Sequence, residues 1–184
     1  SLVWDEDGKE YIDMGSGIAV NAFGIADPIW AAAVSEQLGK LQHCSNLYFS
    51  EPCAKLAEAL CERTGMKKVF FGNSGAEANE CAIKAARKYA ADKYGPERCK
   101  IVTLINSFHG RTIATLTATG QEEMHKDFQP LVPGFIYTPA NDCEALRKLV
   151  AEHDDIAAFM FELVQGEGGV MPLEQSFVDC MVEI

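Results

Sequence analysis

Three short segments of this chain carry side chains suited to binding an anion or moving a proton, and each follows an apolar run. They read NSGAE at 73–77, NSFHGR at 106–111 and ELVQGEGG at 162–169. Together they offer glycine backbone for close approach to a ligand, a guanidinium for a carboxylate, an aromatic face and two carboxylates. Each segment also admits a purely structural explanation.

The first segment fits the S-x-x-E pattern of a helix capping box, in which Ser74 caps one backbone N–H and Glu77 reaches back to another. Its surroundings add a second role. Gly75 and Ala76 would begin an alanine-rich helix that packs closely on a sheet, so that their N–H groups point out at the strand ends and suit a phosphate. The pattern matches neither GxxxxGK[ST] nor GxGxxG. The cap and the phosphate cradle are compatible.

The second segment brings Phe108, Gly110 and Arg111 close together after an apolar run. A lone aromatic residue at such a position is more often core than function. The combination of a flat face, a close backbone approach and a planar fork matched to a carboxylate favours binding. We expect the histidines outside this segment to be surface or packing residues: His43, His125 and His153.

The third segment places two carboxylates after an apolar run. Glu162 stands at the expected strand end, where a carboxylate is costly unless paired, so we predict that it has a partner in the site. Glu167 lies among three glycines, in backbone able to turn tightly and hold a side chain in a cleft. The structural alternative for both is a pair of solvent-exposed loop acids.

From residue 69 onward, short apolar runs alternate with helical patterns. The runs lie at 69–71, 101–105, 135–137 and 156–161, and the helical stretches near 76–93, 111–118 and 142–153. This alternation predicts an α/β fold with a mostly parallel sheet, right-handed crossovers and helices on both faces. Ligands in such folds bind at the carboxyl ends of the strands, which is where the three segments begin.

The chain before residue 69 has a different pattern. Apolar pairs at 3–4 and 11–12 flank a D-G step, which predicts an antiparallel hairpin. The stretch GSGIAVNAFG at 15–24 is too rich in glycine for a helix and too uncharged for an ordinary loop, which indicates close backbone packing or a ligand wall. Pro28 and Pro52 each open a predicted helix, the second with leucines at core spacing.

Composition excludes several classes of function. Sixteen Lys+Arg against 27 Asp+Glu give a formal net charge of −11, so no nucleic acid or membrane partner is expected. The seven cysteines form no CxxC pair, which indicates reduced, intracellular thiols and neither a disulfide framework nor a metal site. The chain opens without methionine and stops within an apolar-periodic segment, so we expect both ends to be cut.

Five segments occur in the order found in class III pyridoxal-phosphate aminotransferases, and the chain resembles that family over nearly its whole length. They read VWDEDGKEYIDMGSGIAVNAFG, HCSNLYFSEP, FFGNSGAEANECAIKAARK, SFHGRT and ELVQGEGGVMP. The resemblance implies the large domain of a fold-type-I PLP-transferase, truncated. It further implies an N-terminal hairpin and dimer-contact segment at 1–50 and the first part of the PLP-binding domain at 51–184.

The resemblance also assigns roles to individual residues. The family's cofactor-binding positions, which cradle the phosphate, face the pyridine ring or lie near it, match Ser74, Gly75, Ala76, Phe108, His109 and Glu162. Its substrate-binding positions match Arg111, Glu167 and Asn21, with the arginine gripping the α-carboxylate. Pyridoxal 5'-phosphate is the implied cofactor.

Two positions depart from the family pattern. Leu163 stands where the family usually has proline, and 24–28 reads GIADP where a glycine-histidine-x-histidine-proline turn is usual. The first change touches no reacting group, whereas the second affects how the segment around Asn21 would meet a neighbouring subunit. The family's Schiff-base lysine and its pyridine-nitrogen aspartate both follow the third segment, beyond Ile184. No catalytic residue is therefore expected within this chain, and we predict that it is inactive alone.

For the full-length protein the resemblance is strongest to the branch that transaminates N-acetylornithine, or a related ω-amino acid, with 2-oxoglutarate in arginine biosynthesis. The alternatives are ornithine or 4-aminobutyrate transamination, a glutamate-semialdehyde mutase or decarboxylase-type relative, and a non-catalytic binding protein on the same fold. The resemblance implies a homodimer. The expected location is intracellular, either the bacterial cytoplasm or the mitochondrial matrix of a eukaryote.

Overall fold

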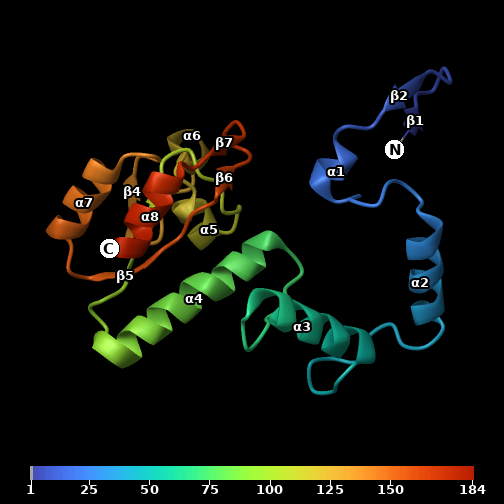
Figure 1. Ribbon diagram of the computed structural model, residues 1–184, viewed down its shortest axis with the longest axis horizontal. Coiled ribbons are helices and arrows are strands. Elements are labelled where there is room, and N and C mark those ends of the chain that lie inside the picture. Colours follow the sequence, from blue (N-terminus) through green and yellow to red (C-terminus); the bar gives the residue numbers. More distant parts are fainter. Residues whose placement is uncertain (1) are drawn as a thin grey trace. The chain divides into compact units, whose positions relative to one another are not determined.

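The structure is a computed structural model that describes residues 2–184 (Figure 1). The chain divides into two compact units, of which the first ends at Val69 and the second spans Phe70–Ile184. The functional division that we expected after residue 50 stays a prediction. None of the helices in the described part of the chain is both long and apolar enough to cross a membrane.

The first unit opens with the predicted hairpin, which is confirmed. Strands β1 (Leu2–Trp4) and β2 (Glu10–Ile12) pair antiparallel. Asp5 stabilises the turn: its Oδ1 accepts the N–H of Lys9 at 2.9 Å and its Oδ2 accepts the hydroxyl of Tyr11 at 2.8 Å. The bond from Tyr11 is the main cause of a lowered pKa at Asp5.

The glycine-rich stretch forms no ordinary helix, as predicted. The short element α1 (Ser16–Ala19) contains left-handed backbone at Gly17, with φ 64°, and at Ile18, with φ 61°. The Ile18 side chain is 94% exposed, and Val20 and Phe23 are exposed as well. The expected ligand wall therefore stays a prediction, because within its own unit this stretch presents its apolar side chains to solvent.

Both proline-led helices are confirmed. Helix α2 (Pro28–Leu38) is capped by Asp27, whose Oδ1 accepts the N–H of Trp30 at 2.8 Å. Helix α3 (Glu51–Thr64) ends at Gly65, whose φ of 72° is the left-handed conformation that glycine allows at a helix end. Neither helix contains a buried residue, so the leucines at core spacing in α3 do not enter a core here.

The second unit is built on a parallel sheet with the order β4-β3-β5. Its strands are β3 (Lys100–Leu104), β4 (Phe135–Thr138) and β5 (Ile156–Phe159), all close to their predicted ranges. The strand predicted at 69–71 is wrong. A strand requires a neighbouring strand for its hydrogen bonds, and none of residues 2–184 pairs with this run, so Phe70 and Phe71 remain exposed.

Helices cover both faces of this sheet, which confirms the predicted fold class. On one face Leu104 shares a buried cluster with Leu146 and Phe177. These belong to α7 (Cys143–Glu152) and α8 (Gln175–Glu183). On the other face the guanidinium of Arg87 in α4 (Gly75–Tyr94) lies 5.3 Å from the ring of Phe135. Register places Phe135 beside Ile101, on the face opposite Leu104.

Two short helices and one hairpin complete the second unit. Helices α5 (Ile113–Ala118) and α6 (Glu122–His125) follow β3, and α5 contacts α4. Strands β6 (Val164–Gln165) and β7 (Met171–Pro172) pair antiparallel and form a hairpin after β5. Residues 166–170, including Glu167, form the loop of this hairpin.

Candidate functional site

The second and third chemistry-bearing segments meet at the carboxyl ends of β3 and β5, which are neighbours in the sheet. The N–H of Phe108 donates to Glu162 Oε2 at 2.9 Å, and the N–H of Gly166 donates to Glu162 Oε1 at 3.3 Å. The prediction that Glu162 has a partner is therefore confirmed. Backbone N–H groups satisfy the carboxylate, so it ties the two loops together without an opposite charge.

The first segment forms the N-terminus of α4. Ser74 is the N-cap, and its Oγ accepts the N–H of Glu77 at 3.2 Å as predicted. A full capping box would also have the Glu77 carboxylate accept the N–H of Ser74. Here Glu77 Oε2 accepts the N–H of Asn73 instead. The reason is close packing: a Cβ at Gly72 would lie only 3.1 Å from Glu77 Cβ, so the chain before the helix folds back over that side chain.

Two backbone donors remain free at this helix end. The first regular bond of α4 runs from the N–H of Ala78 to the Ser74 carbonyl, so the N–H groups of Gly75 and Ala76 have no intrahelical acceptor. A Cβ at Gly75 would meet no atom within 4 Å, so the space beside it is open. Free donors, the positive end of the helix dipole and open space make this a site for an anion.

The turn after β3 packs directly against this helix end. Gly110 has φ 135°, and a Cβ there would lie 2.8 Å from Ala76 Cβ and 2.6 Å from Thr115 Oγ1. Asn79 of α4 reinforces the contact, because its Nδ2 donates to the His109 carbonyl at 2.8 Å. The structure thus brings the anion site and the 106–111 segment together, and only glycine fits at their junction.

Phe108 and Arg111 lie next to each other at the same edge of the sheet. The Arg111 guanidinium is 5.7 Å from the centre of the Phe108 ring, a cation–π distance. Phe108 is half-buried, Arg111 is exposed, and within residues 2–184 the arginine forms no salt bridge. The acidic chain therefore presents a permanently charged fork at this edge, available to an anionic ligand.

His109 is buried, with 5% of its surface exposed. Its N–H donates to Thr119 Oγ1 at 2.9 Å, while its ring Nε2 is buried and has no hydrogen-bond partner in the described chain. Burial lowers the pKa of His109, and the charge of Glu162 opposes this shift.

Glu167 lies exposed in the loop between β6 and β7. Its Oε2 accepts a hydrogen bond from Gln121 Nε2 at 2.6 Å, and the same nitrogen donates to the Ser107 carbonyl at 3.1 Å. The loop is thereby held to the segment that follows β3. Glu167 is thus an exposed loop acid, as the structural alternative describes, and a neutral partner holds it there. Its substrate-binding role stays a prediction.

Several residues that hold the site were missed from the sequence: Asn79, Thr119 and Gln121. Each acts through side-chain bonds to another segment of the chain, which the local sequence spacing does not predict. One signal was available at Gly120, since a glycine directly before Gln121 marks a close backbone approach. A Cβ there would lie 2.1 Å from the Leu104 carbonyl oxygen.

Asn21 is the one predicted site residue that belongs to the first unit. Its N–H donates to the Ser16 carbonyl at 2.8 Å, and its carbonyl accepts the N–H of Gly24 at 3.0 Å. These bonds shape the turn after α1. The substrate-binding role of Asn21 stays a prediction.

Comparison with known proteins identifies relatives of this chain. The family model of aminotransferase class III matches residues 1–184. Acetylornithine aminotransferase of Haemophilus ducreyi is 54% identical over 179 residues, which is 97% of this chain and 45% of the relative. Succinylornithine transaminase of Citrobacter koseri is 46% identical over 184 residues, 100% of this chain and 45% of the relative.

A solved structure of ornithine aminotransferase from Toxoplasma gondii, with partial occupancy of PLP at its active site, is also similar. It superimposes with a TM-score of 0.91 at 30% identity, covering 99% of this chain and 43% of that one. The chain therefore spans less than half the length of the relatives that it matches.

Proposed function

The chain belongs to the aminotransferase class-III family, and we propose that the intact protein transfers an amino group between an amino acid and a 2-oxo acid. Pyridoxal 5'-phosphate is the cofactor of this family. The observation that carries the proposal is the junction at Gly110, where two segments meet at one edge of the sheet: an open helix N-terminus from one, and the Phe108 ring and the Arg111 guanidinium from the other.

The residues of this edge fit a planar cofactor that carries a phosphate. Ser74, Gly75 and Ala76 would hold the phosphate, because the two free N–H groups face open space at the start of α4. Phe108 would set the plane of the ring by stacking, and His109 offers its unpartnered Nε2 nearby. When bound, the cofactor supplies the electron sink for removing a proton from the amino-bearing carbon.

The remaining residues would orient the substrate. Arg111 would bind the α-carboxylate with its planar fork and thereby decide which end of the substrate reacts. Glu162, held by two backbone N–H groups, would keep the loops after β3 and β5 in register beside the cofactor. Glu167 would face the far end of the substrate.

For the substrate we propose N-acetylornithine or a related ω-amino acid, with 2-oxoglutarate as the amino acceptor, in arginine biosynthesis. The names of the most similar relatives support this choice, since they act on acetylated and succinylated ornithine. Ornithine and 4-aminobutyrate are the competing amino donors. A donor screen on the intact protein decides among them.

We propose further that the protein is a homodimer and that residues 1–184 alone are catalytically inactive. The exposed apolar side chains of 15–24 and 44–49 support the first proposal. Among the lysines, Lys88 pairs with Asp92 on the surface of α4, and Lys100 pairs with Asp155 at 2.9 Å, so these two are engaged in ion pairs. Transaminase turnover by the purified 184-residue chain would contradict the second proposal.

The decisive experiment is an absorbance titration of the intact protein with pyridoxal phosphate, followed by borohydride reduction. An aminotransferase develops a lysine-linked cofactor band that borohydride abolishes, whereas a non-catalytic binding protein binds the cofactor without this band. Arg111→Ala should then lower kcat/KM for the amino acid by roughly 100-fold while cofactor binding persists, because a charge-assisted carboxylate contact is lost. Equal activity of wild type and variant would exclude the role proposed for Arg111.

A further inference from the structure

The side chain of Gln121 joins two loops of the site. It stands at the start of α6, where a side chain would ordinarily cap the helix, yet it makes no capping bond. Its Nε2 instead donates to the Ser107 carbonyl at 3.1 Å and to Glu167 Oε2 at 2.6 Å. Both hydrogens of the amide group are thus used, one to fix Gln121 and the other to hold Glu167.

The backbone that carries Gln121 is firmly placed. Asn106 donates its N–H to the Gly120 carbonyl at 2.8 Å, and the N–H of Gly120 donates to Ser107 Oγ at 3.1 Å. Gly120 also lies so close to the Leu104 carbonyl oxygen that a Cβ would approach it to 2.1 Å. Gln121 therefore projects from a fixed point beside the carboxyl end of β3.

The loop that carries Glu167 is anchored on both sides of this residue. Gln165 is buried, and its Nε2 donates to the Ile105 carbonyl at 2.9 Å. A Cβ at Gly168 would lie 2.3 Å from the Asn106 carbonyl oxygen, so the backbone packs on the turn after β3. Between these anchors the Glu167 side chain is exposed, and within residues 2–184 its carboxylate receives a hydrogen bond from Gln121 alone.

We propose that Gln121 is a positioning residue that sets the location of the Glu167 carboxylate and thereby the affinity for the far end of the substrate. The inference rests on the proposed transaminase function and names a determinant of the same site. The Gln121 amide is neutral, so it holds the Glu167 carboxylate without cancelling its charge. A lysine or arginine at position 121 would instead form an ion pair and compete with the substrate.

The test compares Gln121→Ala and Gln121→Glu in the intact holoenzyme. The alanine variant should raise KM for the amino donor by about threefold to tenfold, the value of one ordinary hydrogen bond, because the Glu167 carboxylate is exposed, while kcat stays within about twofold. The Gln121→Glu variant should raise KM by more than about tenfold, because it removes both donors and sets a second carboxylate against Glu167. Glu122→Gln, at an exposed neighbouring position, is the matched control and should leave both constants unchanged.

A double-variant cycle separates positioning through Glu167 from a general structural role. In a Glu167→Ala background, Gln121→Ala should add no further rise in KM, because the group that it positions is absent. Additive effects, or a fall in kcat equal to the rise in KM, would overturn the inference.

A crystal structure of Gln121→Ala gives a readout that needs no turnover: the Glu167 carboxylate should leave its place beside the Ser107 carbonyl, and its retention there would also overturn the inference. Different results contradict the proposed transaminase function and the proposed role of Gln121. If the wild-type protein shows no transamination with any donor, the proposed function is wrong. If the wild-type protein is active and the effects in the cycle are additive, only the role of Gln121 is wrong.

Discussion

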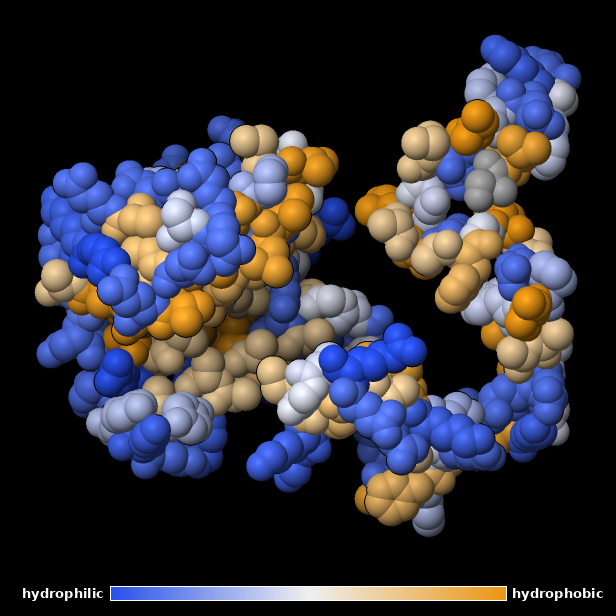
Figure 2. Space-filling view, in the orientation of Figure 1, coloured by the Kyte–Doolittle hydropathy of each residue, from blue (hydrophilic) through white to orange (hydrophobic). Residues whose placement is uncertain are grey.

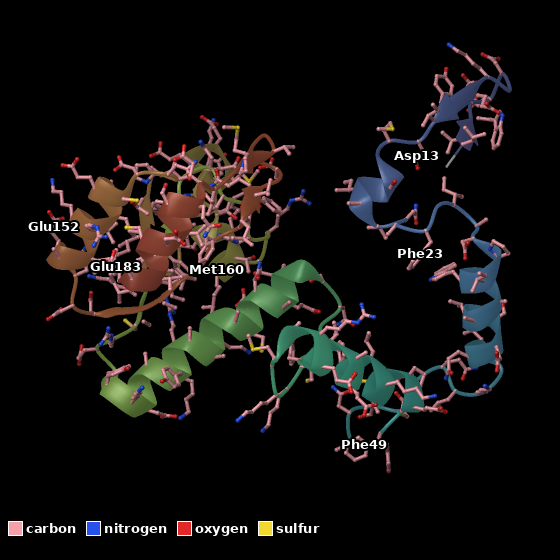
Figure 3. The ribbon with its side chains drawn as sticks, in the orientation of Figure 1. Asp13, Phe23, Phe49, Glu152, Met160 and Glu183 are labelled. Atoms are coloured by element: carbon pink, nitrogen blue, oxygen red, sulfur yellow. The ribbon has the colours of Figure 1, made fainter. Side chains whose placement is uncertain are left out.

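The two units of the chain differ in what their apolar side chains contact. In the unit that ends at Val69, hydrophobic residues lie at the surface (Figure 2). Neither α2 nor α3 has a buried residue, and Phe49, labelled in Figure 3, is fully exposed. In the unit from Phe70 to Ile184, Leu146 and Phe177 are completely buried. Among residues 2–184, every fully buried hydrophobic side chain belongs to this second unit.

The difference follows from the architecture of each unit. A parallel sheet with crossover helices buries apolar side chains on both faces, as β3 does between α4 and the pair α7 and α8. A two-stranded hairpin followed by separate helices has no face on which to bury them, and such a hairpin is only marginally stable by itself. The second unit therefore holds its site with its own core, whereas the first exposes surface suited to a partner.

The substitution Gly110→Ala is expected to have the largest effect, and this effect is on the stability of the second unit. The added methyl group would lie 2.6 Å from Thr115 Oγ1 and would force alanine into left-handed backbone, so the second unit should lose about 4 kcal/mol of unfolding free energy. Urea denaturation measures this, with Gly166→Ala as control, because a Cβ at Gly166 meets no atom within 4 Å. Equal stability of both variants would show that the junction at Gly110 is not tightly packed.

A second pair of variants directly tests the difference in burial of apolar side chains between the two units. Leu146→Ala should cost about 3 kcal/mol, since it opens a cavity in a fully buried cluster. Phe49→Ala should change unfolding of the monomer by less than about 0.5 kcal/mol, because its side chain is fully exposed. Thermal unfolding in dilute solution compares the two. A large cost at Phe49 that grows with protein concentration would instead reveal burial against a second subunit.

The smallest expected effect is on the pH dependence of the stability, and it arises from His109. Burial lowers the pKa of this ring below its unfolded value of 6.5, so the unfolded state binds more protons between the two values. The resulting stability is present above pH 6.5 and is lost as pH falls through the folded pKa. Denaturation of wild type and His109→Gln across this window should show a shallower pH dependence for the variant. Identical slopes would indicate that the ring titrates normally.

Much of the second unit follows from local pattern. The alternation of apolar runs and helical stretches predicts β3, β4, β5, α4, α5 and α7 to within a few residues. Chemistry-bearing residues that follow neighbouring strands then meet at one edge, and the partner predicted for Glu162 is the backbone N–H of Phe108. The strand predicted at 69–71 does not form, because an apolar run becomes a strand only where a neighbouring strand supplies hydrogen bonds.

The sequence by itself determined which residues could hold a phosphate, a planar ring and a carboxylate, because residue type and position after a strand are local properties. It also determined that the backbone at position 110 can adopt a positive φ, because Gly110 takes a conformation that other residues rarely adopt. The tertiary structure alone decided two partners: Asn79 with the His109 carbonyl, and Gln121 with Glu167. Both bonds join segments far apart in the chain, so they depend on how the sheet brings its strand ends together.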